Sequence, residues 1–318
     1  MKAIYFNGKD AEYREDIPKP QRKQGYSLIR IQRAAICNTD KEILKGYRPD
    51  FRGVMGHEFV GTVEESDRVE LIGKTVVGEL NEGCGECLYC RTGHEKHCPQ
   101  RKVIGMEGRD GCFGEYMFLA DHLIHVIPDG LTIEKAIYTE PLAAALEIPS
   151  QVHISPEKSV AVIGDGRLAF MIAQVLSLNG SDLTIIGKHK EKLDKFQQYG
   201  QIKLLEEVPE HPLIDETYDI IVDATGTESG ILLAQRLIRR CGTIVLKSTY
   251  AHKASLDMSL FVVNEITIVG SRCGPFEPAL QLLKKGLVEF PEIEWHDLKD
   301  YEAAFCSSAF KVGFRISD

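Results

Sequence analysis

The sequence lacks any apolar run near the roughly 18 residues that a membrane-spanning helix needs, which excludes insertion into a bilayer. Its first residues, MKAIYFNGKDAEYRED, contain no apolar segment followed by a small-residue cleavage site. We therefore expect no secretion signal and a cytoplasmic location. Internal repeats and low-complexity segments are absent as well, which excludes a repeat architecture.

Positive charge is in deficit, because 38 Lys and Arg face 47 Asp and Glu, for a net charge of −9. Such a chain repels phosphate backbones and acidic membranes, so we expect neither a nucleic acid nor a membrane as partner, and a small molecule instead. With 318 residues, 43% hydrophobic and 27% charged, the chain has the composition of a globular protein and the length of two domains.

Disulfides are not expected, because the sequence has no export signal and its nine cysteines are an odd number. Four cysteines stand singly, and for these we expect core packing: Cys112, Cys241, Cys273 and Cys306.

Four other cysteines lie in one short stretch, GCGECLYCRTGHEKHC, with the spacing C-x2-C-x2-C-x7-C: Cys84, Cys87, Cys90 and Cys98. Four thiolates can close a tetrahedron around Zn²⁺ at about 2.3 Å per bond, which leaves no position for a substrate. The pattern predicts a structural zinc site. An iron–sulfur cluster or a C-x-x-C redox pair remains an alternative.

From residue 1 to about 125, short β-rich runs alternate with glycines: KAIYF, YSLIRIQRAAI, EFVGTVEE, KTVVGEL and GEYMFLA. This part predicts a twisted antiparallel β domain. From about residue 157 apolar strands alternate with amphipathic helices: SVAVIG, RLAFMIAQVLSLNG, DLTIIG, KEKLDKFQQYG, YDIIVDATG, SGILLAQRLIRRCG and TIVLKS. That order is typical of a parallel sheet covered on both faces, and hence of an α/β fold.

The segment GDGRLA follows the first of these strands and opens a helix, the context that the G-x-G-x-x-G/A dinucleotide fingerprint requires. Gly164 permits the tight turn, and Gly166 lets the backbone approach a pyrophosphate at the helix N-terminus. Arg167 and Leu168 begin that helix. The alternative is an ordinary glycine turn.

Three further places carry metal-ligand residue types: Cys37 in AAICNTD, His57 with Glu58 in VMGHEFVG, and Glu140 in YTEPLAAALE. Each is weak by itself. A cysteine after an apolar strand can be core, GHE can be a turn, and a glutamate before proline can suit a helix N-terminus.

Taken in order along the chain, the motifs CNTD, GHEFVG, the four-cysteine lobe, TEPLAAALE, GDGRLA and DATG resemble the zinc-dependent medium-chain dehydrogenase/reductase family. This resemblance implies an α/β protein made of a GroES-like β-rich catalytic domain and a Rossmann domain with a doubly wound parallel sheet. The first would span residues 1–125 and be completed by residues 271–318, the second would span residues 126–270, and the active site would lie between them.

The resemblance also implies a catalytic zinc held by Cys37, His57 and Glu140, with a fourth position open to the substrate. Glu58 is then a nearby carboxylate that can enter the ligand shell, and Asp40 can accept the other imidazole N–H of His57. With the lobe, the chain would hold two zinc ions.

Proton transfer in the resembling enzymes needs a hydroxyl at the metal, and Thr39 matches it, with a helix N-cap as the alternative. A histidine that ends the proton relay in several alcohol dehydrogenases is Glu42 here, so the later part of the proton path departs from that of those enzymes. Arg272 is expected either to reach the substrate or the carboxylates, or to form a surface ion pair. Tyr47, Phe51 and Phe113 are candidates for the substrate pocket.

The reaction implied is hydride transfer between a secondary alcohol or polyol, or the matching ketone, and a nicotinamide cofactor. Two alternatives are a zinc-free quinone-reductase-like enzyme and a nucleotide-binding structural or regulatory protein on the same fold. By the resemblance, the segment SLDMSLFVVNEITIVGS would form a sheet edge that pairs with its twin, so a homodimer or homotetramer is expected.

The segment LTIIGKHKEKL indicates NADP(H) rather than NAD(H). In NAD enzymes an acidic residue about 20 positions after the fingerprint bonds the ribose 2′-hydroxyl, and here that position is Gly187. Lys188, His189, Lys190 and Lys192 follow at an expected helix start, where cations are disfavoured unless an anion is bound. Further cofactor contacts are expected from Ala224, Thr225, Gly226 and Ser248.

Overall fold

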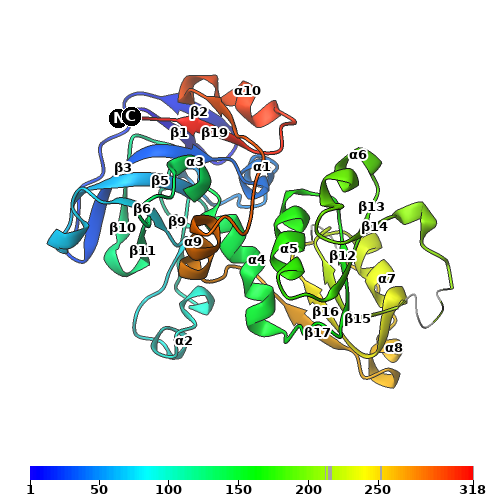
Figure 1. Cartoon of the computed structure of the whole chain (residues 1–318). Helices are drawn as coiled ribbons and strands as arrows, with labels where there is room; N and C mark the ends of the chain where they lie inside the picture. The colour runs from blue at the N-terminus through cyan, green and yellow to red at the C-terminus, as the bar shows by residue number, and fades with distance from the viewer. Residues whose placement is uncertain (212, 214–216, 251–252, 318) are drawn as a thin grey trace. The chain divides into compact units, whose positions relative to one another are not determined.

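The computed structural model describes residues 1–211, 213, 217–250 and 253–317 (Figure 1). The chain forms two compact units, one of residues 1–140 and 276–318 and the other of residues 141–275. These limits differ from the expected limits at residues 125 and 270. Residues after 125 stay with the first unit because β11 (Ile124–Val126) pairs with β6 (Thr75–Gly78).

The first unit contains three sheets. A seven-stranded sheet has the order β11-β6-β5-β3-β19-β18, with β10 also paired to β3. The remaining strands of this sheet are β3 (Tyr26–Ala35), β5 (Glu58–Glu65), β10 (Tyr116–Ala120), β18 (Glu294–His296) and β19 (Val312–Arg315). Two three-stranded sheets comprise β1 (Ala3–Phe6), β2 (Ala11–Arg14) and β4 (Gly53–Val54), and β7 (Asn81–Glu82), β8 (Lys102–Ile104) and β9 (Gly108–Arg109). The expected β-rich domain is thereby confirmed.

Short helices connect these strands. They are α1 (Asn38–Leu44), η1 (Val69–Leu71), α2 (Leu88–Arg91), η2 (Glu95–His97), η3 (Asp121–Leu123), α3 (Ile133–Ala136), α9 (Phe276–Lys284), η7 (Leu298–Asp300) and α10 (Tyr301–Cys306), and α4 (Thr139–Gln151) begins in this unit.

The core of the first unit contains two of the aromatic residues expected in a substrate pocket. Phe113 is fully buried and packs edge-on against Phe314, with ring centroids 5.1 Å apart. Phe51 is 5% exposed and stacks on Phe6. Because both rings fill the core, the prediction that they line a pocket is wrong. Tyr47 is 44% exposed.

The second unit is built on a six-stranded sheet in which every pair is parallel. Its order is β14-β13-β12-β15-β16-β17, which places the first strand of the unit at the centre and its third and sixth at the edges. The strands are β12 (Ser159–Ile163), β13 (Asp182–Gly187), β14 (Gln201–Leu204), β15 (Tyr218–Asp223), β16 (Ile238–Leu246) and β17 (Thr267–Gly270). This is the doubly wound order of dinucleotide-binding sheets, as expected.

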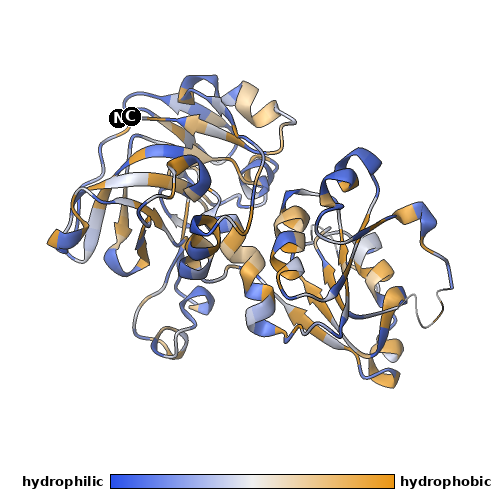
Figure 2. Cartoon of the chain, viewed as in Figure 1, coloured by the Kyte–Doolittle hydropathy of each residue, from blue (hydrophilic) through white to orange (hydrophobic). Residues whose placement is uncertain are grey.

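Apolar strands and amphipathic helices form the core of the second unit. The central strands contain continuous hydrophobic runs, residues 160–163 in β12 and 220–222 in β15 (Figure 2). Helix α5 (Arg167–Ser177) packs on β12 and β13, and α7 (Glu228–Leu237) packs on β15 and β16. The remaining helices are α6 (Lys190–Leu193), η4 (Asp194–Phe196), η5 (Leu205–Glu207) and α8 (Met258–Val263).

The helix expected over residues 190–200 is shorter than its sequence indicates. Helix α6 ends at Leu193 after four residues and tightens into η4. A single turn aligns few peptide dipoles, so the macrodipole argument for an anion at this position loses most of its force.

Two of the four single cysteines are not core residues. Cys112 is buried, but Cys241 and Cys306 are exposed and Cys273 is half-buried. Cys241 lies in β16 with a φ of 60°, and Cys306 ends α10. Among the described residues, no helix is long and apolar enough to cross a membrane. The cytoplasmic location stays a prediction.

Candidate functional site

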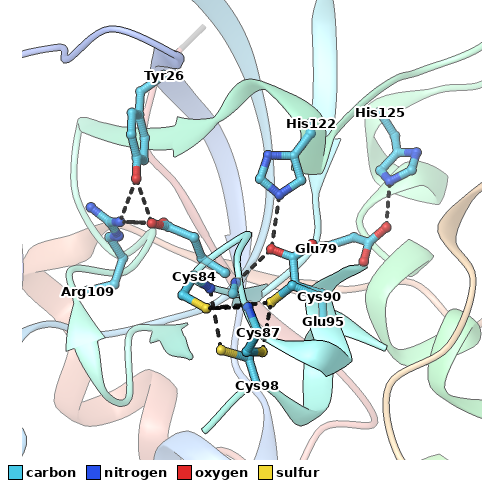
Figure 3. A network of polar contacts seen from close by, with 12 residues as sticks. Tyr26, Glu79, Cys84, Cys87, Cys90, Glu95, Cys98, Arg109, His122 and His125 are labelled. Atoms are coloured by element: carbon cyan, nitrogen blue, oxygen red, sulfur yellow. Dashed lines mark hydrogen bonds and ion pairs between the residues drawn. The ribbon is translucent and has the colours of Figure 1, made fainter. Parts of the chain in front are cut away.

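The four-cysteine lobe brings its sulfurs to one point (Figure 3). The Sγ atoms of Cys84, Cys87, Cys90 and Cys98 all lie within 4.8 Å of one another. The Cys87–Cys90 and Cys84–Cys90 sulfur pairs are 3.5 and 4.0 Å apart. A tetrahedron with bonds of 2.3 Å has sulfurs about 3.8 Å apart, so the spacing fits a zinc ion and is far too long for a disulfide.

Backbone N–H groups also point at these sulfurs, as they do toward thiolates. Cys84 Sγ accepts from the N–H of Cys87 at 3.4 Å, and Cys98 Sγ accepts from the N–H of Gln100 at 3.3 Å. Hydrogen bonds from the N–H groups of Glu86 and Cys87 lower the pKa of Cys84 to about 7. Desolvation raises the pKa of Cys90 to about 12, so its thiolate would be stabilised by a bound cation.

Polar contacts connect the four-cysteine lobe to the rest of the first unit. Glu82, just before the lobe, forms a buried ion pair with Arg109 and accepts a hydrogen bond of 2.6 Å from the Tyr26 hydroxyl (Figure 3). Glu95 accepts from the N–H of Gly83 at 2.6 Å and lies 3.0 Å from His122 Nε2. None of these partners follows from the cysteine motif, and sequence reasoning missed all of them.

A second cluster of metal-ligand groups forms between α1 and β5. One ligand atom each of Cys37, His57 and Glu58 lies within 4.8 Å of the others. His57 and Glu58 are 2% and 1% exposed. Glu58 Oε1 is buried without a hydrogen-bond partner. Because a buried carboxylate oxygen is costly to leave unpaired, the donor set fits a bound cation. Thiolate, imidazole and carboxylate together are zinc ligands.

The carboxylate of Asp40 contacts two members of this cluster, Cys37 and His57. Its Oδ2 accepts from the backbone N–H of Cys37 at 2.8 Å, which makes Cys37 the N-cap of α1. Its Oδ1 lies 3.4 Å from His57 Nδ1, close enough for an ion pair but not aligned for a hydrogen bond. Burial lowers the pKa of His57, but the charge of Asp40 and contacts with Asp40 and Cys37 raise it well above its ordinary value. The distance between the two side chains shows that Nδ1 is the ring nitrogen of His57 that faces Asp40.

Lys311 is a residue of this cluster that sequence reasoning missed. Its Nζ donates to Glu58 Oε2, and the side chains of the two are 3% and 1% exposed. Lys311 directly precedes β19, whose pairing with β3 brings it to the cluster. The one signal in the sequence is a lysine inside the apolar run AFKVGF.

The other residues expected at the catalytic site lie as follows. Thr39 is in the first turn of α1, with Oγ1 3.7 Å from Cys37 Sγ, and so it is not the N-cap. Glu42 pairs with Lys45 at 2.9 Å at the surface. Glu140 lies in the first turn of α4 and does not belong to the group of ligand atoms within 4.8 Å of one another. Arg272 is exposed in the second unit.

The second unit has a pocket of about 280 Å³ at the carboxyl ends of β12, β13 and β15. In an open α/β sheet, ligands bind where the strand order reverses, and here that is between β12 and β15. Six of the residues expected to contact a cofactor line it: Gly164, Gly166, Gly187, Lys188, Ala224 and Thr225.

The fingerprint glycines lie in this pocket with the backbone that their role requires. Gly164 has a φ of 130°, which a residue with a side chain rarely adopts. A Cβ at Gly166 would point into open space, so the glycine leaves the N-terminus of α5 accessible. The first N–H groups of this helix lack partners within it, and a pyrophosphate is the ligand that suits them.

Six other expected cofactor residues do not line the pocket: Arg167, Leu168, His189, Lys190, Gly226 and Ser248. The basic side chains after β13 are exposed. Lys190 lies 3.8 Å from Asp194, and Lys192 lies 3.5 Å from His189 Nδ1. Sequence reasoning missed the rest of the lining: Ile163, Asp165, Ile186, Leu205, Thr227, Ser229, Gly230 and Leu233.

Comparison with known proteins agrees with both units. Residues 23–129 match the family model described as the alcohol dehydrogenase GroES-like domain. The chain is 27% identical to the erythritol/L-threitol dehydrogenase of Mycolicibacterium smegmatis, over 93% of this chain and 90% of that protein.

Two solved structures share the fold. One is a dehydrogenase of Sinorhizobium meliloti 1021, described as zinc-binding and bound to NADP, with a TM-score of 0.90 and 22% identity over 99% of this chain and 98% of that one. The other is an alcohol dehydrogenase of Escherichia coli CFT073 complexed with NADH, with a TM-score of 0.90 and 23% identity over 99% of both chains.

A GroES-like unit with a cysteine lobe and a dinucleotide-binding unit make up this chain. In both units the chain is similar to zinc-type medium-chain dehydrogenases, the family that its motifs resemble.

Proposed function

We propose that this protein is a zinc-dependent oxidoreductase that transfers a hydride between a secondary alcohol or polyol, or the matching ketone, and NADP(H). The observation that carries the proposal is the buried group of Cys37, His57 and Glu58, with its unpartnered carboxylate oxygen, in a chain that also has a dinucleotide pocket. The polyol named for the M. smegmatis relative supports the substrate class.

Zinc would be held by Cys37, His57 and a carboxylate from Glu58 or Glu140, and a second zinc by the four-cysteine lobe. When bound at the first site, zinc supplies a Lewis acid for the substrate oxygen, and the nicotinamide carries the hydride. Asp40 fixes the orientation of the His57 imidazole. Lys311 holds Glu58 by one oxygen and leaves the other available to a cation.

Thr39 is the proposed first carrier of the substrate proton. Its hydroxyl lies 3.7 Å from Cys37 Sγ, beside the proposed metal site. Glu42 is paired with Lys45, which argues against it as the next carrier. The proton path beyond Thr39 therefore runs through groups other than the side chain at position 42.

The test is an assay of the zinc-loaded protein against a panel of secondary alcohols, polyols and ketones, followed by nicotinamide absorbance. We expect turnover with at least one member of the panel and two zinc ions per chain by elemental analysis. Turnover without metal would indicate a quinone-reductase-like enzyme. Cofactor binding without turnover on any substrate would indicate a regulatory protein.

The same assay tests the cofactor. Gly187 carries no acidic side chain, and in the described part of the chain the exposed Lys188 forms no ion pair, so its ammonium is available to a 2′-phosphate. We expect kcat/KM to favour NADPH over NADH by at least about tenfold, roughly 1.4 kcal/mol. Lys188→Ala should reduce that preference and hardly change the rate with NADH. Equal use of both cofactors by the unmodified enzyme contradicts the proposal.

A homodimer is proposed to form through the edge of the second unit. Strand β17 is the last strand of its sheet, and apolar side chains on it and on the preceding α8 are exposed. Met258, Val262 and Val263 are 61%, 76% and 77% exposed, and Ile268 is 40% exposed. Pairing with a second copy would cover both the open strand edge and this apolar patch.

Light scattering at micromolar concentration should give the mass of a dimer or tetramer. Val263→Glu should shift the mass toward the monomer, because it places a charge in the proposed interface. Leu178→Glu, at another exposed apolar position of the same unit, is the control and should leave the mass unchanged. A strictly monomeric wild-type protein would rule the interface out.

A further inference from the structure

The nucleotide pocket contains a carboxylate that comes from the fingerprint itself. Asp165 stands between Gly164 and Gly166, lines the pocket, and has a side chain that is 13% exposed. Its Oδ2 accepts hydrogen bonds from the backbone N–H groups of Lys188 and His189 at 2.8 and 2.9 Å. Nδ1 of the His189 ring lies 2.8 Å from the same oxygen. The turn after β13 thus already binds an anionic oxygen, which belongs to the protein.

Gly187 is what lets Asp165 reach this position. A Cβ at residue 187 would lie 2.7 Å from Asp165 Cβ and 2.9 Å from Leu193 Cδ2, closer than real Cβ contacts allow. NAD-binding enzymes carry an acidic side chain at this end of the strand, and β13 has Gly187 there instead. The carboxylate of Asp165, from the neighbouring loop, lies next to this glycine.

Asp165 keeps its negative charge there. Burial raises the pKa of its carboxyl, but the hydrogen bonds from the His189 N–H, the His189 ring and the Lys188 N–H outweigh burial and hold the pKa below its ordinary value. A cofactor 2′-phosphate placed at the end of β13 would be repelled by this charge. It could not accept hydrogen bonds from the N–H groups of Lys188 and His189, because both already donate to Asp165.

We propose that Asp165 is a specificity-determining residue that opposes the 2′-phosphate of NADP(H), by its charge and by occupying the N–H groups of Lys188 and His189. The exposed lysines attract the phosphate and Asp165 limits its binding, so the cofactor preference is the difference between two opposed effects. The inference rests on the proposed function only in taking a nicotinamide dinucleotide as the ligand of this pocket.

The test measures the dissociation constants of NADPH and NADH for the full-length, zinc-loaded wild-type protein and for Asp165→Asn. Asparagine keeps the size and one acceptor oxygen but removes the charge. We expect NADPH to bind about tenfold more tightly to the variant, while NADH binding changes by less than about threefold. Asp165→Ala also frees both N–H groups, and it should shift the ratio of the two constants in the same direction.

Asp182→Asn is the matched control, since it removes the same charge from the exposed opposite end of β13, about 16 Å away at 3.3 Å per residue. That charge is screened from the pocket, so neither dissociation constant should change appreciably. Thermal midpoints of all variants are recorded alongside.

Three results would overturn the inference. The first is an unchanged ratio of the NADPH and NADH dissociation constants in both Asp165 variants. The second is an equal weakening of both cofactors together with a lowered thermal midpoint, which would mean that Asp165 only stabilises the contact between the two turns. A selective loss of NADH would identify Asp165 as a ribose ligand instead. A wild-type protein that prefers NADH would count against the proposed cofactor but not against this inference, because the inference concerns the change in the ratio.

Discussion

Replacement of Cys37 by alanine is expected to lower kcat/KM by at least about a thousandfold, some 4 kcal/mol, and to leave the protein folded. Cys37 is the thiolate donor of the Cys37, His57 and Glu58 group. Its side chain is partly exposed, and its backbone N–H donates to Asp40 Oδ2 at the start of α1. Alanine therefore removes a ligand and preserves this backbone hydrogen bond to Asp40.

The measurement combines steady-state kinetics with elemental analysis and a thermal midpoint. The variant should hold one zinc ion per chain instead of two and melt within a few degrees of the wild type. Cys306→Ala is the control, because Cys306 is exposed in the same unit and belongs to neither cysteine group. A Cys37→Ala enzyme with near-normal turnover would remove the site from the mechanism.

Substitution of a cysteine in the four-cysteine lobe is expected to lower stability and to leave turnover nearly unchanged. Cys87→Ala should lower the thermal midpoint by about 10 °C, because loss of a structural metal belongs to the substitutions that cost several kcal/mol, at about 2–4 °C per kcal/mol for a chain of this size. Without the ion, no bond joins the remaining sulfurs, and the stretch from Cys84 to Cys98 keeps only short helices, four residues in α2 and three in η2.

Turnover per folded molecule of Cys87→Ala, measured well below its midpoint, should stay within about threefold of the wild type, since the lobe presents no open ligand position. Chelation that removes only this ion should reproduce the lowered midpoint. An unchanged midpoint would mean that Glu82, Arg109 and Tyr26 suffice to order the lobe. Iron instead of zinc in the elemental analysis would support the alternative of an iron–sulfur cluster.

The parts of this protein that sequence predicts are those fixed by local pattern. Strand β12 and the fingerprint turn follow from an apolar run that meets two glycines, and the lobe follows from four cysteines within fifteen positions, Cys84 to Cys98. Chain order and hydrophobic period are enough for such features. From such features the β-rich unit, the parallel sheet of the second unit and the resemblance to the family could be predicted.

What sequence did not reveal are contacts between distant residues. Lys311 meets Glu58 across 253 positions, and Asp165 meets the turn after β13 across 23 and 24. Lys311 belongs to no ligand motif, and Asp165 occupies a position of the fingerprint at which the motif specifies no residue type. Cys241 is exposed although it stands within a strand, and its φ is positive. Such features arise from tertiary packing, which composition and periodicity do not encode.

The pairing of β19 with β3 also bears on the order in which the chain can fold. Residues 141–275 are contiguous, so the second unit has all its strands as soon as they have been synthesised. The first unit begins earlier but lacks a strand of its main sheet until residues 312–315 emerge, and Glu58 lacks its lysine until residue 311 does. On the ribosome, the unit that starts first is completed last, and the nucleotide-binding unit is able to form before Glu58 acquires its ion pair with Lys311.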